Sequence, residues 1–260
     1  MSIIKGLETT FNSIYTKYDR WRPTYVKELY DDIFDVKAIN PSSDVLEVGI
    51  GTGQATLPIL ETGCSLTAIE LGDKLADFSR YKFKNYEKFN VKNMAFQDFQ
   101  CPPDSFDLIF SASAFHWIPE DIGYTKVFDM LKSGGVFARF ANHPYKDKER
   151  NNINIAFENI YAKYMPGSLV GDEYSEENAK IRANIAYKYG FVDISYKLYH
   201  RTRSFTADEY TLLLGTYSDH IAIEETTRIK FFDEIREAIN DNGGIITLYD
   251  TIDLQLARKP

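Results

Sequence analysis

Residues 47–53 have the sequence Glu-Val-Gly-Ile-Gly-Thr-Gly. They close a short apolar run, residues 44–50, of the kind that forms a buried parallel strand. Gly49 and Gly51 allow the backbone to turn sharply and to approach a ligand where a Cβ atom would collide. An ordinary turn between a strand and a helix does not need glycine at three alternate positions. We therefore expect a ligand-binding loop here, ahead of a helix over residues 54–62.

Outward from this loop, apolar runs and amphipathic stretches alternate along the chain. Apolar runs predict further strands over residues 65–71, 91–99, 106–115 and 136–142. Amphipathic stretches predict helices over residues 73–86 and 120–135, the second closed by a glycine pair. Such alternation predicts a doubly wound α/β domain, in which a parallel sheet has helices on both faces. Its ligand is expected at the carboxyl ends of the strands.

The chain divides into four expected segments, at residues 1–40, 41–144, 145–189 and 190–260. The first holds two helices, at residues 7–18 and 23–36, and the second is the α/β core. The third is polar and helix-like without a clear strand, which suits an insertion or a cap over a substrate. The last holds two further strands, at residues 191–205 and 243–258, separated by a helical region at residues 207–240.

The composition restricts the class of protein. The chain has 260 residues and a formal net charge of -8, so it lacks the basic surface that nucleic-acid binding requires. Small molecules are the expected partners of a monomer or homodimer. Cys64 and Cys101 match neither a disulfide framework nor a zinc site, so we expect two buried thiols and no metal. We also expect a cytoplasmic protein, because the sequence has no signal peptide and no run of about 20 apolar residues.

A nicotinamide-dependent dehydrogenase is the competing class, because its fingerprint also opens a helix and carries an acidic residue about 20 positions later. That fingerprint is GxGxxG, whereas Gln54 stands three positions after Gly51 and Thr52 three positions after Gly49. Glu47 would also place a negative charge near a pyrophosphate. The glycine spacing therefore disfavours a dinucleotide.

The pattern ExGxGxG, with acidic residues at the ends of the second and third expected strands, resembles class I S-adenosylmethionine-dependent methyltransferases. Residues 106–118, FDLIFSASAFHWI, are similar to the methyltransferase type 11 group. The resemblance implies a Rossmann-like fold with a seven-stranded, mostly parallel sheet whose last strand is antiparallel. It also implies S-adenosylmethionine as the cofactor and S-adenosylhomocysteine as the product.

The resemblance assigns roles to the glycine loop and to one later carboxylate. Gly49, Gly51 and Gly53 would hold the amino-acid part of the cofactor, with Glu47 in contact directly or through water. A carboxylate beside a cationic sulfonium and ammonium is favourable in a dry cleft. Glu70, at the end of the second expected strand, would accept hydrogen bonds from both ribose hydroxyls.

Further positions follow from the third and fourth expected strands. By resemblance, Asp98 would accept a hydrogen bond from the adenine amino group, and Phe99 or its neighbours would flank the ring. Ser111 and Ala112 would lie where the fourth strand meets the cofactor.

Two residues after the fourth expected strand point toward the acceptor pocket. His116 is a candidate general base or substrate contact, although a lone histidine is more often structural. Trp117 is expected to form a wall of the acceptor pocket.

Two segments outside the core resemble a subgroup that includes trans-aconitate methyltransferase-like proteins. Residues 16–30, TKYDRWRPTYVKELY, are similar to its YxxxRPxYP segment, with Val26 in place of the second proline. The resemblance makes Tyr15, Tyr18 and Arg22 candidates for contacts at the methionine end of the cofactor. Tyr217 belongs to the carboxyl-terminal similarity and is a candidate substrate contact.

The methyl acceptor is expected to be a small molecule. A carboxylate acceptor needs no base and would be anchored by cationic groups, for which the candidates are Arg22, Arg139, His143, Arg201 and Arg203. A phenol, hydroxyl or amine would give His116 a larger role. RNA or protein acceptors remain alternatives, as does a non-catalytic binder of S-adenosylmethionine or a nucleotide.

Overall fold

The computed structural model describes residues 7–145, 149, 151–167, 171 and 173–260. Within these residues, seven strands form one sheet with the order β3-β2-β1-β4-β5-β7-β6. The strands are β1 Asp44–Val48, β2 Ser65–Glu70, β3 Phe89–Asn93, β4 Phe106–Ala112, β5 Leu131–Tyr145, β6 Val192–Thr206 and β7 Ile245–Arg258. Strands β1 to β5 are parallel, whereas β7 is antiparallel to both β5 and β6. The predicted Rossmann-like sheet with an antiparallel last strand is confirmed.

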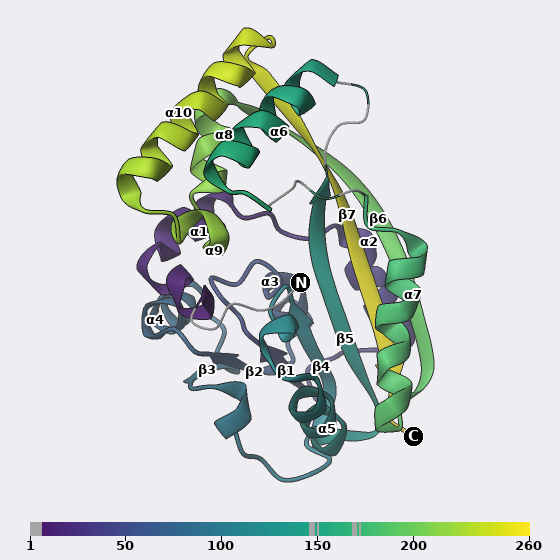
Figure 1. Cartoon of the computed structure of the whole chain (residues 1–260). Helices are drawn as coiled ribbons and strands as arrows, with labels where there is room; N and C mark the ends of the chain where they lie inside the picture. Colours follow the sequence, from purple (N-terminus) through teal and green to yellow (C-terminus); the bar gives the residue numbers. More distant parts are fainter. Residues whose placement is uncertain (1–6, 146–148, 150, 168–170, 172) are drawn as a thin grey trace.

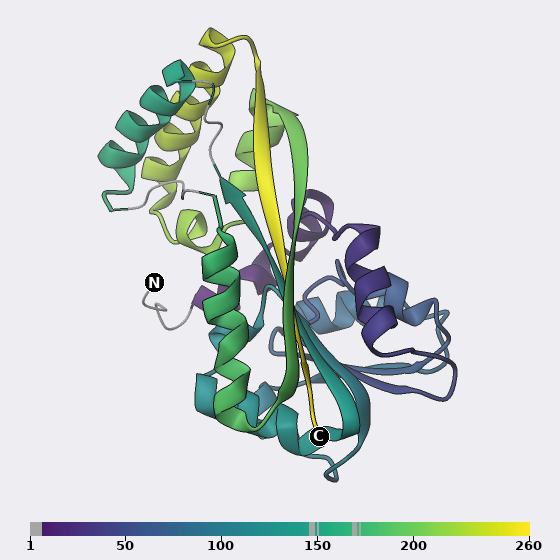
Figure 2. The ribbon, with the colours of Figure 1, turned by 90° about the vertical axis from the view of Figure 1, so that its right-hand side faces the viewer.

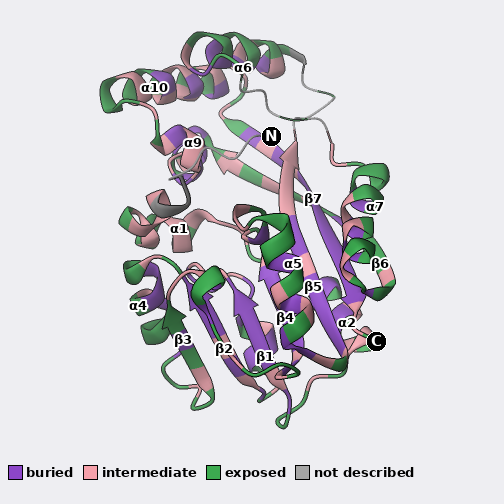
Figure 3. Cartoon of the chain, turned by 60° about the horizontal axis from the view of Figure 1, so that its bottom comes forward, coloured by how far each residue is buried: buried purple, intermediate pink, exposed green. Residues whose placement is uncertain are grey.

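Helices cover both faces of the sheet (Figure 2). One face carries α2 Lys27–Val36, α3 Leu57–Leu60 and α4 Asp73–Lys82. The other face carries α5 Glu120–Met130, α7 Glu176–Asn184 and the 3₁₀ helix η4 Ile185–Tyr189. Figure 3 shows that the inner strands β1, β2, β4 and β7 are largely buried, whereas the edge strands β3 and β6 and the outer sides of α4, α5 and α7 are exposed.

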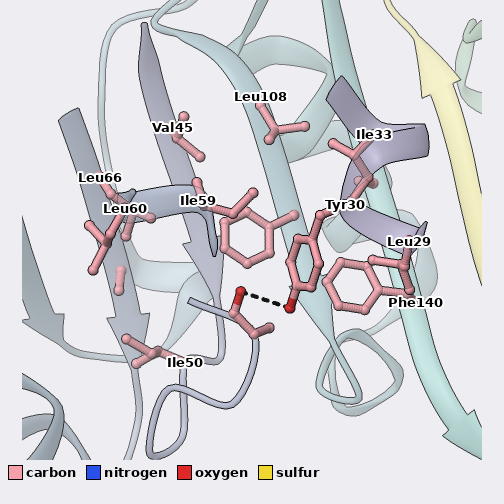
Figure 4. Close-up of a cluster of buried hydrophobic side chains, with 14 of the residues drawn as sticks. Leu29, Tyr30, Ile33, Val45, Ile50, Ile59, Leu60, Leu66, Leu108 and Phe140 are labelled. Atoms are coloured by element: carbon pink, nitrogen blue, oxygen red, sulfur yellow. Dashed lines mark hydrogen bonds between the residues drawn. The ribbon is translucent and has the colours of Figure 1, made fainter. Parts of the chain in front are cut away.

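The core on the α2 face lies beneath the ligand loop. Leu29, Tyr30 and Ile33 form the buried stripe of α2 and pack against residues of β1 and β4 (Figure 4). The hydroxyl of Tyr30 donates a hydrogen bond of 3.1 Å to the carbonyl oxygen of Ala55. This bond ties α2 to the segment that follows β1, and so it stabilises the base of the loop.

The long strands β5, β6 and β7 support a helical cap at the carboxyl ends of the parallel strands (Figure 1). The cap consists of α6 Asn151–Tyr164, α8 Ala207–Leu214, α9 Ser218–Ile221 and α10 Glu225–Asp241. Its core includes Phe231 and Ile235 of α10 and two residues at the start of β7, Ile246 and Leu248. The 3₁₀ helix η1 Leu7–Ser13 contacts α9, and α1 Tyr15–Trp21 contacts α4 and α8. The N-terminal segment therefore lies between the cap and the core.

Several expected boundaries were wrong. The strand expected at residues 91–99 ends at Asn93 and is followed by a 3₁₀ helix, η2 Phe96–Asp98. The helix expected at residues 54–62 is reduced to α3, which has Pro58 in its first turn and irregular turns before it. The first N-terminal helix ends before Arg22, which precedes Pro23 and has extended backbone angles, and the second begins only at Lys27.

The third expected segment does not behave as one unit. Within it, α6 packs against α10 of the cap, whereas α7 packs against β6 and β7.

Cys64 is buried as expected, but Cys101 is only partly buried. Among the described residues, no helix is long and apolar enough to cross a membrane, and no group of three or more metal-ligating side chains gathers.

Candidate active site

A cavity of about 390 Å³ opens at the carboxyl ends of the parallel strands. Nine residues singled out from the sequence line it: Tyr18, Arg22, Glu47, Gly49, Gly51, Glu70, Ala112, Trp117 and Tyr217. They come from α1, from the ends of β1, β2 and β4, and from the cap. The topology thus brings distant parts of the chain to one place, as the rule for open α/β sheets requires.

The glycine loop follows β1 with three left-handed residues. Gly49, Gly51 and Gly53 have φ angles of 77°, 58° and 80°. A Cβ on Gly49 would lie 2.5 Å from the Cβ of Ala114, and a Cβ on Gly53 would lie 2.3 Å from a ring carbon of Phe83. A Cβ on Gly51 would meet nothing closer than 3.7 Å. Gly49 and Gly51 therefore shape the cavity wall, whereas Gly53 stands outside it and is required for packing.

Two buried carboxylates lie at the base of the cavity. Glu47 is 1% exposed, and its Oε2 accepts a hydrogen bond of 2.8 Å from Thr56 Oγ1. Burial, with a smaller contribution from the charge of Glu70, raises the pKa of Glu47 to about 8. Burial also raises the pKa of Glu70, although this carboxylate accepts hydrogen bonds from the backbone N–H groups of Gly51, at 2.8 Å, and Gly72, at 2.9 Å. A positively charged ligand would relieve both groups.

Arg22 closes the cavity on the side of the cap. Its Nη2 donates a hydrogen bond of 2.8 Å to the carbonyl oxygen of Thr216. Its Cζ lies 4.2 Å from the ring centroid of Tyr217 and 5.2 Å from that of Tyr18, distances typical of cation–π contacts. The Nε of Arg22 is buried without a hydrogen-bond partner. This side chain therefore retains a donor for an anionic group.

Sequence reasoning missed several residues of the cavity wall. Tyr25 is hydrogen-bonded through its hydroxyl to Ser113 Oγ at 2.8 Å, and Ser113 has a φ of 52° directly after β4. Asn142, near the end of β5, also lines the cavity and donates to Asp250 Oδ1 at 3.0 Å. The position of Tyr25 in the quoted N-terminal segment was the available signal, since that segment also contains Tyr18 and Arg22.

The structure does not bring the predicted adenine contacts to the cavity. Asp98 is exposed, and Phe99 is buried in the core on the α5 face. The 3₁₀ helix η2 is the cause, because it turns the chain away after β3. Residues 94–97 line the cavity instead.

Other predicted residues also lie outside the cavity wall. Ser111 is fully buried and donates a hydrogen bond of 2.7 Å to the carbonyl oxygen of Val48. Tyr15 packs against Phe78, with ring centroids 5.6 Å apart. His143 is hydrogen-bonded to Asp253 on the opposite face of β5, because successive side chains of a strand alternate between faces.

His116 belongs to the 3₁₀ helix η3 Phe115–Trp117 and lies beside the cavity, with its ring centroid 4.8 Å from that of Trp117. The side chain reaches solvent, yet desolvation by the surrounding protein lowers its pKa to about 4, with Arg182, Arg139 and His143 adding to the effect. His116 is therefore a neutral imidazole at neutral pH.

Comparison with known proteins finds methyltransferases. Residues 45–135 match the model of a methyltransferase domain. The chain is also 26% identical to a malonyl-[acyl-carrier protein] O-methyltransferase of Paenibacillus sp., over 82% of this chain and 81% of that protein. These matches support a class I S-adenosylmethionine-dependent methyltransferase. S-adenosylmethionine is therefore its cofactor.

Solved structures support the fold of this methyltransferase. A protein of Anaeromyxobacter dehalogenans, proposed to be a type II methyltransferase, superposes with a TM-score of 0.63 at 18% identity, over 91% of this chain and 97% of that chain. A Haemonchus contortus phosphoethanolamine N-methyltransferase in complex with S-adenosylmethionine gives 0.56 at 15% identity, over 100% and 60%. The narrower likeness to trans-aconitate methyltransferase-like proteins stays a prediction.

Proposed function

We propose that this methyltransferase transfers the methyl group of S-adenosylmethionine to a small-molecule acceptor by in-line displacement. The observation that carries the proposal is the mixed lining of the cavity. Two buried carboxylates and the glycine loop line it together with the aromatic side chains of Trp117 and Tyr217. The carboxylates suit a cationic cofactor, and the aromatic side chains suit a small organic acceptor.

The chain's own residues fit the cofactor. We assign Glu47 to the neighbourhood of its cationic amino-acid part and Glu70 to the ribose hydroxyls, since both oxygens of Glu70 retain acceptor capacity. Arg22, with its unpaired Nε, is assigned to the carboxylate. Residues 94–97 replace Asp98 and Phe99 in the assignment of the adenine surroundings.

The protein's main task in methyl transfer is to align the acceptor with the methyl group of the cofactor. Bound S-adenosylmethionine supplies a methyl group on a sulfonium that is already a good leaving group. The protein holds the acceptor at near-attack distance and excludes water. Arg22 and Tyr217 line the cavity on the side of the cap. His116 lies outside the cavity wall, so an acceptor that needs no base fits this site better than an amine or phenol.

The other readings are less well supported. The net charge of -8 disfavours an RNA acceptor, and a cavity of about 390 Å³ suits a small molecule better than a protein segment.

The test is calorimetric titration with S-adenosylmethionine, S-adenosylhomocysteine and NADH. We expect the first two to bind and NADH to give no binding signal. Changing Glu70→Ala should weaken binding at least tenfold, whereas Glu87→Ala, at an exposed position, should leave binding unchanged. Equal affinities of the two variants would remove Glu70 from the site. A search for methyl transfer from labelled cofactor to small acids and phenols then separates an enzyme from a binder.

A further inference from the structure

A second group of polar side chains lies beside the cavity, on the face of the sheet that carries α5 and α7. Arg139 of β5, Arg182 of α7 and His116 of η3 come from three separate elements. They are close enough for the charges of both arginines to lower the pKa of His116. His143, four residues after Arg139 on the same face of β5, completes what we call the basic cluster.

The two arginines have few partners of their own. Arg139 Nη1 donates a hydrogen bond of 3.0 Å to the hydroxyl of Tyr124, and its Cζ lies 5.3 Å from the ring centroid of Phe115. No described carboxylate forms an ion pair with Arg139. Arg182 lies beside the hydroxyl of Tyr174, where its charge lowers the pKa of that group against the larger effect of burial, and no described carboxylate forms an ion pair with Arg182. Neighbouring cations without counter-charges repel each other, and functional sites are where folds tolerate such groups.

The charge of the basic cluster is incompletely balanced. Asp253 of β7 is the carboxylate that acts on Arg139, but it is already hydrogen-bonded to His143 Nε2 at 2.8 Å and to the side-chain amide of Gln255. Desolvation by the surrounding protein and the charges of the two neighbouring arginines favour the neutral form of the His116 imidazole. The two guanidinium groups and this one carboxylate leave a net charge of one positive unit.

Buried polar atoms on the same strand face are also unpaired. Arg139 Nε has no hydrogen-bond partner, and neither do Gln255 Oε1 and Thr251 Oγ1. Gln255 is the register partner of Arg139, and Thr251 is the register partner of His143. Most buried polar groups in proteins are satisfied, so a group of unpaired atoms around unpaired cations indicates a ligand.

The basic cluster adjoins the acceptor side of the cavity. The ring centroid of His116 lies 4.8 Å from that of Trp117, which lines the cavity. His143 stands between Asn142 and Pro144, both of which line the cavity as well. Tyr174 stacks on His143 with ring centroids 3.9 Å apart and forms an edge of the basic cluster. The basic cluster therefore borders the cavity through His116, whereas the side chain of His143 lies on the other face of β5.

We propose that Arg139 and Arg182 bind a carboxylate of the methyl acceptor, one that is separate from the atom that receives the methyl group. A guanidinium group matches the planar geometry of a carboxylate with two parallel hydrogen bonds. A single carboxylate also matches the net charge of the basic cluster better than a phosphate dianion does. The acceptor is thus a small molecule with a carboxylate at the end remote from methyl transfer. This inference rests on the proposed function.

Arg182 is the residue to change, because no described carboxylate forms an ion pair with it. Protein loaded with S-adenosylhomocysteine is titrated with linear dicarboxylic acids of various chain lengths and with monocarboxylic acids of the same lengths. In the wild type, at least one dicarboxylate should bind tenfold or more tightly than its monocarboxylate partner. Arg182→Gln should remove this preference, and Arg182→Lys should restore part of it. Arg236→Gln, the same change at an ion pair on the surface of the cap, should retain it.

Two results would overturn the inference. One is a wild type that does not distinguish dicarboxylates from monocarboxylates, and the other is a preference that survives in Arg182→Gln. Tighter binding of alkyl phosphates than of dicarboxylates would likewise refute the carboxylate assignment. The affinity for S-adenosylhomocysteine, measured first, separates this outcome from failure of the proposed function, because Arg182 lies outside the cofactor site and its variants should bind that product normally.

Discussion

The raised pKa of Glu47 predicts that cofactor binding is coupled to the release of a proton. Raising this pKa from 4.5 to about 8 means that the ligand-free fold disfavours the carboxylate form by about 5 kcal/mol, at 1.36 kcal/mol per unit. Glu47 is 1% exposed, so solvent screening reduces this figure little. At pH 7 the residue is mainly protonated in the ligand-free protein. A sulfonium and an ammonium nearby favour the carboxylate, so binding must expel the proton.

The direction of the pH dependence follows from this linkage. The affinity for S-adenosylmethionine should rise about tenfold per pH unit between about pH 6 and pH 8 and then level off. In Glu47→Gln this contribution is absent, so the affinities of the two proteins should converge near pH 6 and differ most above pH 8. The folding stability of the ligand-free protein changes with pH in the opposite direction to the affinity. Because the folded-state pKa exceeds the unfolded one, the ligand-free wild type should lose stability relative to the variant as pH rises from 4.5 to 8.

Calorimetry in two buffers with different ionisation enthalpies measures the number of protons released. At pH 7 the wild type should release close to one proton more than Glu47→Gln, which serves as the baseline for protons lost by the ligand itself. A ratio of the two affinities that stays constant from pH 6 to pH 8, with equal proton release, would refute the reasoning. Glu47 would then be charged in the ligand-free protein.

Two further substitutions test the loop and the network that joins the cap to the core. Gly49→Ala should abolish cofactor binding, because its Cβ would lie 2.5 Å from that of Ala114, whereas Gly134→Ala, at a similar positive φ with open space around it, should bind normally in the same titration. Asp250→Asn should lower the free energy of urea unfolding by about 3–5 kcal/mol, because this fully buried carboxylate accepts from Arg201 and Arg203. The exposed Asp233→Asn should change it by less than about 1 kcal/mol, and a similar loss in both variants would contradict the role of burial.

The α/β core was predictable because its signals are local. A buried parallel strand is a short apolar run, and a loop that needs positive φ angles at alternate positions needs glycine. Gly49 and Gly51 therefore indicated both the fold and the position of the cavity. Glu47 and Glu70 followed, since each ends a strand whose carboxyl end faces the ligand.

The end of β3 was not predictable in the same way. Residues 94–99 contain Met, Ala and two Phe, which suit a strand and a 3₁₀ turn about equally. The outcome depends on tertiary packing, since Phe96 and Phe99 are both buried in the core on the α5 face. Because a 3₁₀ helix forms where a strand was expected, Asp98 lies in solvent and residues 94–97 line the cavity.

The far end of β5 shows why the acceptor side was the hardest part to predict. Asn142 and His143 are adjacent in the sequence, but strand alternation sends one to the cavity and the other to the basic cluster. Their partners on β7 differ accordingly, since the side chain of Asn142 is hydrogen-bonded to Asp250 and that of His143 to Asp253. A single sequence shows the alternation but not the partner strand. His143 was therefore expected at the acceptor for its chemistry, and the structure places it on the other face of the strand, beside the arginines that we propose to hold the acceptor's remote carboxylate.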